Sequence, residues 1–427
     1  MGIVEDLAMK FTDPVIDRSL DQEKLDLRRR VRTSLFPWRG QFSPELVELL
    51  LEDLPSNGVI LDPFVGSGTT LFECARKGID AIGAEINPAA ICFATFSEVA
   101  SQRMPARISA VEAVIQQLRH HSRWPIGSLF AEGSDCSQVD DTHMVKAMLA
   151  ELGDSDAATI FRSALLLAMG NKPFVTISRV QAEIDRLRHI LMALPERLGY
   201  CRVIAADARC LPLEDSVASG AITSPPYINV FNYHQQYRPA VELLGAVPLT
   251  VARAEIGANR KHRQNRFLTV VQYGLDMEAA IYELHRVLME NSTVKIIVGR
   301  ESNVRGVPFR NGRLLASIAE GTGQFLIERW QERRFTTRFG ASIYEDILTM
   351  RRVSRPRPRN GFTGREAAVW ELHTAASRFL DPELRADLTL AIDSAETVQP
   401  SPLFDPGAVP WMRRGDSFHV ASTRNNV

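Results

Sequence analysis

The sequence predicts an α/β protein built on a doubly wound parallel sheet. A buried strand at 59–64 leads directly into a glycine-containing turn and then a helical stretch at 71–77. Gly78 ends that helix, and a second short strand at 80–84 ends in Glu85. This order of strand, glycine turn, helix, strand and acidic residue is typical of the ligand-binding half of such a sheet.

Two further apolar strands are expected at 202–206 and 220–223. Four candidate site residues follow the expected strand ends: Gly66, Glu85, Asp207 and Ser224. Open α/β sheets bind ligands at the carboxyl ends of their strands. We therefore expect these four residues to face a single site.

The remaining elements of the sheet are expected after residue 275. They are a helix at 276–289, a strand at 293–298, a helix at 314–319 and a closing hairpin of 325–333 with 344–350. About a hundred residues separate the second and third strands, where one short helix would be enough for this fold. Their apolar residues recur at helical spacing, which predicts an inserted helical subdomain.

The glycine turn has the sequence Gly66-Ser67-Gly68-Thr69-Thr70. Its two glycines allow a sharp turn and a close approach of backbone to ligand, with free amides at the helix start. No Lys follows the second glycine, so the turn is not a Walker-type phosphate loop, and its spacing departs from the dinucleotide fingerprint. We predict a cofactor loop of another kind, with Glu85 about 20 residues further on accepting the hydroxyls of a ribose.

A second motif, Thr223-Ser224-Pro225-Pro226-Tyr227, follows the fourth expected strand. It presents a hydroxyl, a backbone carbonyl and a flat ring together, which suits a planar amine. The exocyclic amine of a nucleobase is a poor nucleophile, and acceptors that hold its hydrogens favour a more reactive, tetrahedral nitrogen. The alternative is a structural turn, because Pro-Pro forces an extended backbone on which Tyr can pack.

Together these motifs resemble the S-adenosylmethionine-dependent amino-methyltransferases of DNA, which make N4-methylcytosine or N6-methyladenine. The resemblance rests on 62–70, Glu85 and 223–227. It extends to 36–42, which is similar to the motif X of that family, and to Asp207, which is similar to the acid of its third motif. The family resemblance implies a seven-strand Rossmann-like methyltransferase sheet with an inserted helical subdomain and a C-terminal appendage.

The resemblance divides the chain into five expected segments. They are an N-terminal arm at 1–30, motif X with the cofactor-binding half of the core at 31–99, a helical insertion at 100–198, the catalytic half of the core at 199–352, and a linker with an appendage at 353–427. One helix, 365–379, is expected in the appendage, which would contact DNA or serve as a packing arm.

The resemblance also implies the residues that bind S-adenosylmethionine. They are Phe36, Trp38, Asp62, Pro63, Phe64, Gly66, Ser67, Gly68, Thr69, Thr70, Glu85, Asn87 and Asp207. Asp62 and the loop at 66–70 would hold the methionine part, Glu85 the ribose and Asp207 the adenine amino group.

The expected catalytic residues are Ser224, Pro225, Pro226 and Tyr227. Methylation within a duplex requires the target base to leave the stack. Tyr227 would stack on the flipped base, while the Ser224 hydroxyl and the Pro225 carbonyl accept hydrogen bonds from its amine. Ser at the first position of the motif favours cytosine N4 as the target amine, with adenine N6 as the alternative target. Less favoured alternatives are an RNA guanine-N2 enzyme and a non-catalytic DNA-binding module.

Local basic clusters, rather than overall charge, would have to bind DNA, because the formal net charge is −1. One such cluster follows the 223–227 motif closely. The candidate DNA-binding residues are Asn232, Tyr233, His234, Arg253, Arg260, Lys261, Arg263 and Arg266.

The five cysteines are scattered without a Cys-x-x-Cys pair, so no metal site is expected. The absence of a Pro-Cys dipeptide argues against methylation at carbon 5 of cytosine. No apolar run approaches the ~20 residues that cross a bilayer, and a cytoplasmic protein without a membrane partner is expected. Double-stranded DNA is the expected partner, with a restriction or phage-defence partner possible by analogy; the sequence does not indicate the oligomeric state.

Overall fold

Seven strands form one mixed sheet in the computed structural model, which describes residues 34–41, 43–122, 141–196, 198–228, 233–258, 262–336, 340–358, 363–378 and 381–412. The strand order is β3-β2-β1-β4-β5-β9-β8. The strands are β1 (Val59–Asp62), β2 (Asp80–Glu85), β3 (Cys201–Ala205), β4 (Ala218–Thr223), β5 (Leu288–Gly299), β8 (Phe325–Thr336) and β9 (Ser342–Arg352). The first five are parallel, and β9 runs antiparallel to both β5 and β8. The predicted doubly wound sheet of seven strands is confirmed.

The strand order reverses between β1 and β4. From β1 the chain proceeds outward to β2 and β3, and it then returns to add β4 on the other side of β1. At such a reversal the connections leave toward opposite faces of the sheet, and a crevice opens at the carboxyl ends of the strands. The glycine turn follows β1 and the Ser224–Tyr227 motif follows β4, so both lie beside this crevice.

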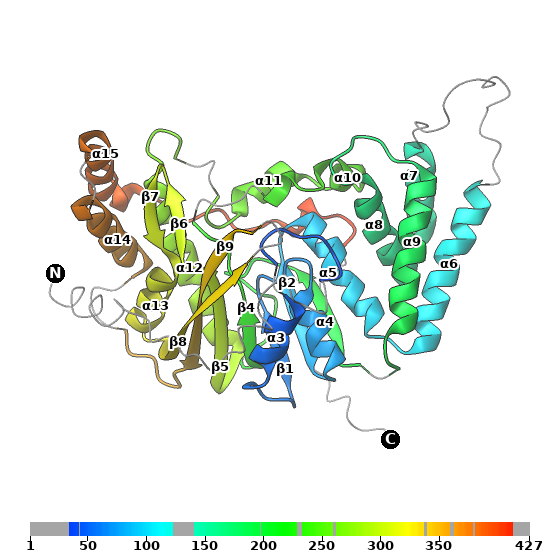
Figure 1. Ribbon diagram of the computed structural model, residues 1–427, viewed down its shortest axis with the longest axis horizontal. Helices are drawn as coiled ribbons and strands as arrows, with labels where there is room; N and C mark the ends of the chain where they lie inside the picture. The colour runs from blue at the N-terminus through cyan, green and yellow to red at the C-terminus, as the bar shows by residue number, and fades with distance from the viewer. Residues whose placement is uncertain are drawn as a thin grey trace.

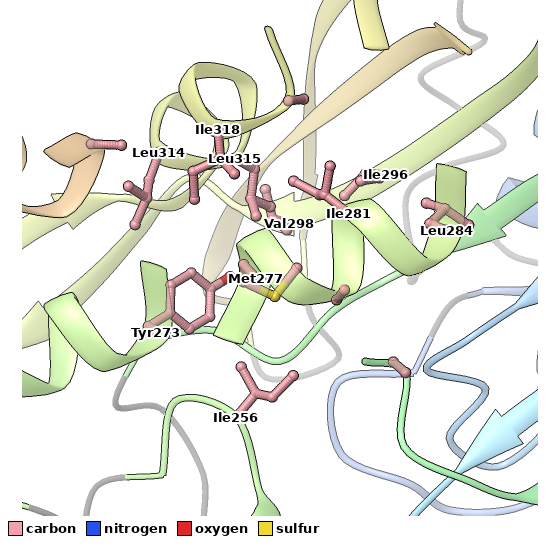
Figure 2. Packing of buried hydrophobic residues seen from close by; sticks show 14 of the residues in the cluster. Ile256, Tyr273, Met277, Ile281, Leu284, Ile296, Val298, Leu314, Leu315 and Ile318 are labelled. Carbon is pink, nitrogen blue, oxygen red and sulfur yellow. The ribbon is translucent and has the colours of Figure 1, made fainter. Parts of the chain in front are cut away.

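Helices cover both faces of the sheet (Figure 1). One face carries α3 (Pro44–Leu51), α4 (Thr69–Arg76) and α5 (Pro88–Ala100), and the other carries α12 (Leu268–Val287) and α13 (Asn311–Gly321). Neighbouring strand residues point to opposite faces: Ile297 packs toward α3 and α4, while Ile296 packs toward α12 (Figure 2). Both faces are buried at the central strands β1 and β4, which explains why their residues are mostly apolar or small.

Four helices between β2 and β3 form a group beside the sheet. They are α6 (Met104–Ser122), α7 (Thr142–Leu152), α8 (Asp156–Met169) and α9 (Ile177–Ala193). They share a separate apolar core with α5 and with α10 (Arg238–Leu243). The buried Arg107 of α6 donates hydrogen bonds to carbonyl oxygens of Leu191, Leu194 and Pro195 at the end of α9. Such bonds satisfy the carbonyls that a helix end leaves without partners.

The C-terminal region contains two helices where the sequence predicted one. They are α14 (Gly364–Arg378) and α15 (Pro382–Asp393), and Asp381 caps α15 by accepting hydrogen bonds from the amides of Glu383 and Leu384. On α14, Glu371 accepts two hydrogen bonds from the buried Arg313 of α13, at 2.6 and 2.7 Å. This pair fixes α14 against the core.

After α15 the chain returns across the molecule toward α5 and α11 (Pro248–Ala254), as the orange-red segment in Figure 1 shows. We call residues 398–412 the C-terminal strap. Its Phe404, Ala408 and Val409 pack with Ile91 of α5 and Val251 of α11. The strap therefore lies next to the carboxyl ends of the strands.

The remaining elements are short. They are the hairpin β6 (Glu301–Val304) and β7 (Val307–Arg310), with η2 (Tyr233–Gln235), η3 (Ala395–Thr397) and η4 (Pro406–Ala408). Within the ranges given above, no helix has the length and apolarity needed to cross a membrane.

Candidate functional site

A pocket opens at the carboxyl ends of β1 to β4. Its volume is about 1080 Å³, which includes the open mouth. The predicted site residues that line it are Trp38, Pro63, Phe64, Gly66, Ser67, Thr69, Glu85, Asn87, Asp207, Ser224, Pro225, Pro226, Tyr227 and Tyr233. The structure thus brings the glycine turn and the Ser224–Tyr227 motif to one pocket.

Asp62 joins these two distant segments beneath the pocket. Its carboxylate accepts hydrogen bonds from the hydroxyls of Thr70, at 2.6 Å, and of Thr223, at 2.7 Å and 161 residues away. Burial raises the pKa of Asp62 to about 6, although these bonds and one from the Phe64 amide favour the ionised form. Asp62 and Thr70 were predicted to touch the cofactor. Neither lines the pocket, because their side chains are turned inward to each other.

Gly66 has a positive φ of 53°, and a side chain there would lie 3.3 Å from the indole nitrogen of Trp38. Only glycine takes this conformation without strain. Gly68 also has a positive φ, of 91°, but it does not line the pocket. The loop therefore exposes bare backbone at Gly66, beside the side chains of Ser67 and Thr69.

Glu85 is held rigidly by backbone amides. Its Oε2 accepts a hydrogen bond from Gly66 at 2.9 Å, and its Oε1 accepts bonds from Ile86 and Asn87 at 2.9 and 2.8 Å. Burial raises the pKa of Glu85 to about 7, against the effect of these three bonds. Since a carboxylate oxygen has two lone pairs, Oε2 can still accept one bond from a ligand.

Asn87 follows Glu85 and caps α5. Its Oδ1 accepts hydrogen bonds from the amides of Ala89 and Ala90, at 3.0 and 3.4 Å. Its Nδ2 is buried and has no hydrogen-bond partner in the part of the chain that the structure describes. A buried amide donor without a protein partner suits an acceptor on a bound ligand.

Trp38 contacts two tyrosines that follow the Ser224–Tyr227 motif. Its ring stacks with Tyr233 at 6.1 Å and with Tyr237 at 6.5 Å between centroids. The Tyr237 hydroxyl also donates a hydrogen bond to the Pro37 carbonyl. Phe36, predicted to bind cofactor, is instead a core residue that stacks on Phe93 at 4.5 Å. The sequence pattern is the same for the core residue Phe36 and the pocket residue Trp38, because both are aromatic and only two positions apart.

Tyr227 lies against the end of β5. A side chain at Gly299 would come within 2.9 Å of Tyr227 Cε2, so glycine is required to seat the ring. Burial raises the pKa of the Tyr227 phenol far above its usual value, with hydrogen bonds to Ser224 and to the Gly299 backbone acting in the opposite direction. The ring is therefore neutral and fixed beside Ser224 at the pocket wall.

Asp207 lines the pocket, but its carboxylate is already occupied. Oδ1 accepts bonds from the backbone amide and Nε of Arg209, and Oδ2 accepts bonds from Arg209 Nη2 and the Phe404 amide. A carboxylate has about four acceptor sites, and all four are used. The predicted contact with an adenine amino group is therefore not available to this side chain. Its partners come from the next turn and from the strap, which the motif does not reveal.

His234 was predicted to contact DNA, and the structure places it inside the protein. Only 3% of the residue is exposed, and its Nδ1 lies 3.1 Å from Oε2 of Glu255. Arg253 and Arg263 are exposed, and Arg266 is half-buried. Asn232, Arg260 and Lys261 lie outside the described residues.

The sequence did not single out Glu255, which also lines the pocket, with Ile256 and Gly257 after it. A single Glu two residues before a glycine is too common a pattern to mark a site. Among the described residues, no group of three His, Cys, Asp or Glu side chains is placed to hold a metal ion.

Comparisons with known proteins add independent findings. Residues 17–95 match the family model described as DNA methylase. The chain is 23% identical over 324 residues to the Type II methyltransferase M.BsoBI of Geobacillus stearothermophilus, covering 61% of this chain and 62% of that protein. It is 47% identical over 55 residues to the Type II methyltransferase M.MjaII of Methanocaldococcus jannaschii, covering 13% and 10%. The chain thus spans less than two thirds of the length of either relative.

Solved structures match with low similarity. A SAM-dependent methyltransferase from Methanosarcina mazei has a TM-score of 0.33 and 13% identity, covering 72% of this chain and 98% of that one. The rRNA methyltransferase aviRa from Streptomyces viridochromogenes has a TM-score of 0.31 and 14% identity, covering 78% and 93%.

Proposed function

The DNA methylase match and the Type II methyltransferase relatives support an amino-methyltransferase family with S-adenosylmethionine as cofactor, and we propose that this chain methylates an exocyclic amine of a DNA base. One observation carries the proposal: the Gly66 loop, Glu85 and the Ser224–Tyr227 motif line the same pocket. The hydrogen bond between Thr223 and Asp62 holds the two halves of this pocket in register.

The donor set of the pocket suits S-adenosylmethionine, which when bound supplies a methyl group on a sulfonium sulfur. Glu85 Oε2 has a lone pair for a ribose hydroxyl, and Asn87 Nδ2 is a donor without a partner among the described residues. Ser67, just before α4, and Thr69, its first residue, would hold the methionine part. Trp38 would limit the position of the methionine end, because it borders Gly66.

The acceptor base would be bound by the Ser224–Tyr227 motif after leaving the duplex, at an unstacking cost of a few kcal/mol. Tyr227 offers a neutral ring for stacking. The Ser224 hydroxyl and the Pro225 carbonyl would accept hydrogen bonds from the amine, which orients its nitrogen lone pair for attack. No covalent enzyme intermediate is required.

Cytosine N4 is the amine we favour, because Ser occupies the first position of the motif. The test is to methylate duplex DNA with labelled cofactor, digest it to nucleosides and identify the product by mass spectrometry. N4-methylcytosine is the expected product. If the product is N6-methyladenine, the target amine is adenine N6 instead. If label appears in tRNA but not in DNA, the proposal of a DNA substrate is wrong.

Cofactor affinity should depend on pH through Glu85. Ribose hydroxyls bind the ionised carboxylate best, and the pKa of about 7 means that this form is lost as the pH falls through neutrality. Affinity for S-adenosylhomocysteine should therefore fall by up to about tenfold per pH unit below about pH 7 and level off above it. Titration calorimetry between about pH 6 and pH 8.5 measures this, and a flat profile would contradict the role given to Glu85.

Arg253 is an exposed basic residue of the predicted DNA-binding set and lies next to the pocket. It is exposed at the end of α11, and the next two residues, Ala254 and Glu255, line the pocket. Arg253→Ala should weaken DNA binding. It should also make the plot of the logarithm of the binding constant against the logarithm of salt concentration less steep by about one, which corresponds to one lost phosphate contact. Arg103→Ala is the control, because Arg103 is exposed at the other end of α5 from the pocket. Equal effects from both variants would exclude a local role for Arg253.

By analogy with the Type II relatives, such an enzyme would act in the cytoplasm and protect DNA from a restriction partner. Single-molecule sequencing of genomic DNA from expressing cells would reveal the methylated base and its sequence context together. If the genomic DNA carried no methylated bases, the proposed role in protecting DNA would be wrong.

A further inference from the structure

Glu255 is a buried carboxylate in the pocket that no step described above uses. The residue is 8% exposed, and its Oε2 pairs with His234. Its Oε1 is buried and has no hydrogen-bond partner among the residues that the structure describes. Leaving a buried carboxylate oxygen without a donor costs free energy, so this atom is suited to a donor that arrives with a ligand.

The loop that carries Glu255 is fixed beside the Ser224–Tyr227 motif. The preceding carbonyl, of Ala254, accepts a hydrogen bond from Arg209. Ile256 points toward α12 and packs with Tyr273 in the core (Figure 2). Gly257 has a positive φ of 70°, and a side chain there would lie 2.7 Å from the backbone oxygen of Tyr227. Loop and motif are therefore in direct backbone proximity.

His234 sets the orientation of this carboxylate. It is 3% exposed, and its Nδ1 lies 3.1 Å from Glu255 Oε2. With a proton on Nδ1, the imidazole donates to Oε2 and leaves Oε1 as the free acceptor. His234 thus acts as a positioning residue, which explains why a histidine so close to the motif is turned inward.

Methylation of an amine releases a proton that has to leave the nitrogen. We propose that Glu255 Oε1 is the acceptor of that proton, an inference that rests on the proposed function. As the bond between the amine nitrogen and the methyl carbon forms, the carbon–sulfur bond breaks with its electron pair on sulfur. The methylated nitrogen then releases one of the two protons that Ser224 and Pro225 had held, and Glu255 accepts it. The carboxyl passes this proton to solvent after the product leaves.

Other ionisable groups surround Glu255. Tyr227, Tyr233, Glu85 and Asp207 line the same pocket, and the guanidinium of Arg209 lies behind the loop. Tyr227 and Tyr233 are kept neutral because burial raises the pKa of each phenol. Asp207 is paired with Arg209. Saturating cofactor removes the dependence of binding on Glu85 from the measured rate.

The test compares Glu255→Gln, Glu255→Asp and wild type in single-turnover methyl transfer to DNA at saturating cofactor. Gln keeps the size of the side chain but cannot take the proton, so the rate should fall by at least about 100-fold. Asp should recover part of the rate. Glu320→Gln is the control, because Glu320 is also buried but lies on α13.

Cofactor binding and folding are measured on the same variants. Affinity for S-adenosylhomocysteine and the melting temperature of Glu255→Gln should stay close to those of wild type. A wild-type rate in Glu255→Gln would overturn the inference, and so would a loss of cofactor affinity as large as the loss of rate, which would make Glu255 a cofactor ligand. If wild type itself transfers no methyl group to DNA, the proposed function fails instead.

Discussion

Replacing Tyr227 with alanine is expected to lower methyl transfer by about 10- to 100-fold, because stacking of a base on an aromatic ring is worth about 1–3 kcal/mol. The ring lies on Gly299 at the pocket wall, while the atoms assigned to the cofactor belong to Glu85 and the loop at Gly66. Cofactor affinity should therefore change little. Single-turnover kinetics and S-adenosylhomocysteine titration on the same preparation measure the two effects separately.

Two other variants sharpen this prediction. Tyr227→Phe retains the ring and should keep most of the activity, whereas Gly299→Val places a side chain within 2.9 Å of the ring edge and should displace it. Gly299→Val is thus expected to resemble Tyr227→Ala although residue 227 is intact. If Tyr227→Ala lost cofactor affinity and turnover equally, the ring would belong to the cofactor site.

The fold could be predicted because its signals are local. Apolar runs marked the strands, and the glycines at 66, 68 and 78 marked the turn and the end of α4. The convergence of Gly66, Glu85 and Ser224 on one pocket follows from the parallel order of the strands, since each residue stands after a carboxyl end. The hairpin of β6 and β7 and helix α15 were missed, because each is too short or too weakly patterned to stand out.

Side-chain partners could not be predicted in the same way. Asp62 and Asp207 both fit their motifs, yet the first bonds Thr70 and Thr223 and the second bonds Arg209. Glu255 carried no sequence signal, because its position depends on Arg209 behind the loop and on Tyr227 beside it. These roles depend on contacts between segments that are far apart in the chain. Such contacts cannot be predicted from a single sequence.

Arg209 is the centre of a buried ionic network under the pocket. Its side chain is 2% exposed and pairs with Asp207 at 2.7 Å and with Asp276 at 2.6 Å. It also donates to the carbonyls of Ser401 and Pro402, while Asp276 accepts bonds from the Ser401 amide and hydroxyl. The network thus attaches the C-terminal strap to the sheet and to α12.

Replacing Arg209 with methionine should lower the free energy of unfolding by about 3–5 kcal/mol, because it leaves two carboxylates buried without their counter-ion. Arg186→Met is the matched control. Its partner, Glu183, lies 2.8 Å away on the surface of α9, where such a pair contributes about 1 kcal/mol or less. Urea unfolding of both variants measures the difference, and equal stabilities would show that the buried network contributes nothing.

Adding Asp207→Asn and Asp276→Asn to Arg209→Met distinguishes the loss of charge balance from the loss of hydrogen bonds. If uncompensated charge is the main cost, the triple variant should recover part of the lost stability, since neutral amides are cheaper to bury than lone carboxylates. The strap would still lack the bonds that Arg209 donates to Ser401 and Pro402. We therefore expect cofactor affinity, which depends on the neighbouring pocket wall, to stay below that of wild type even where stability returns.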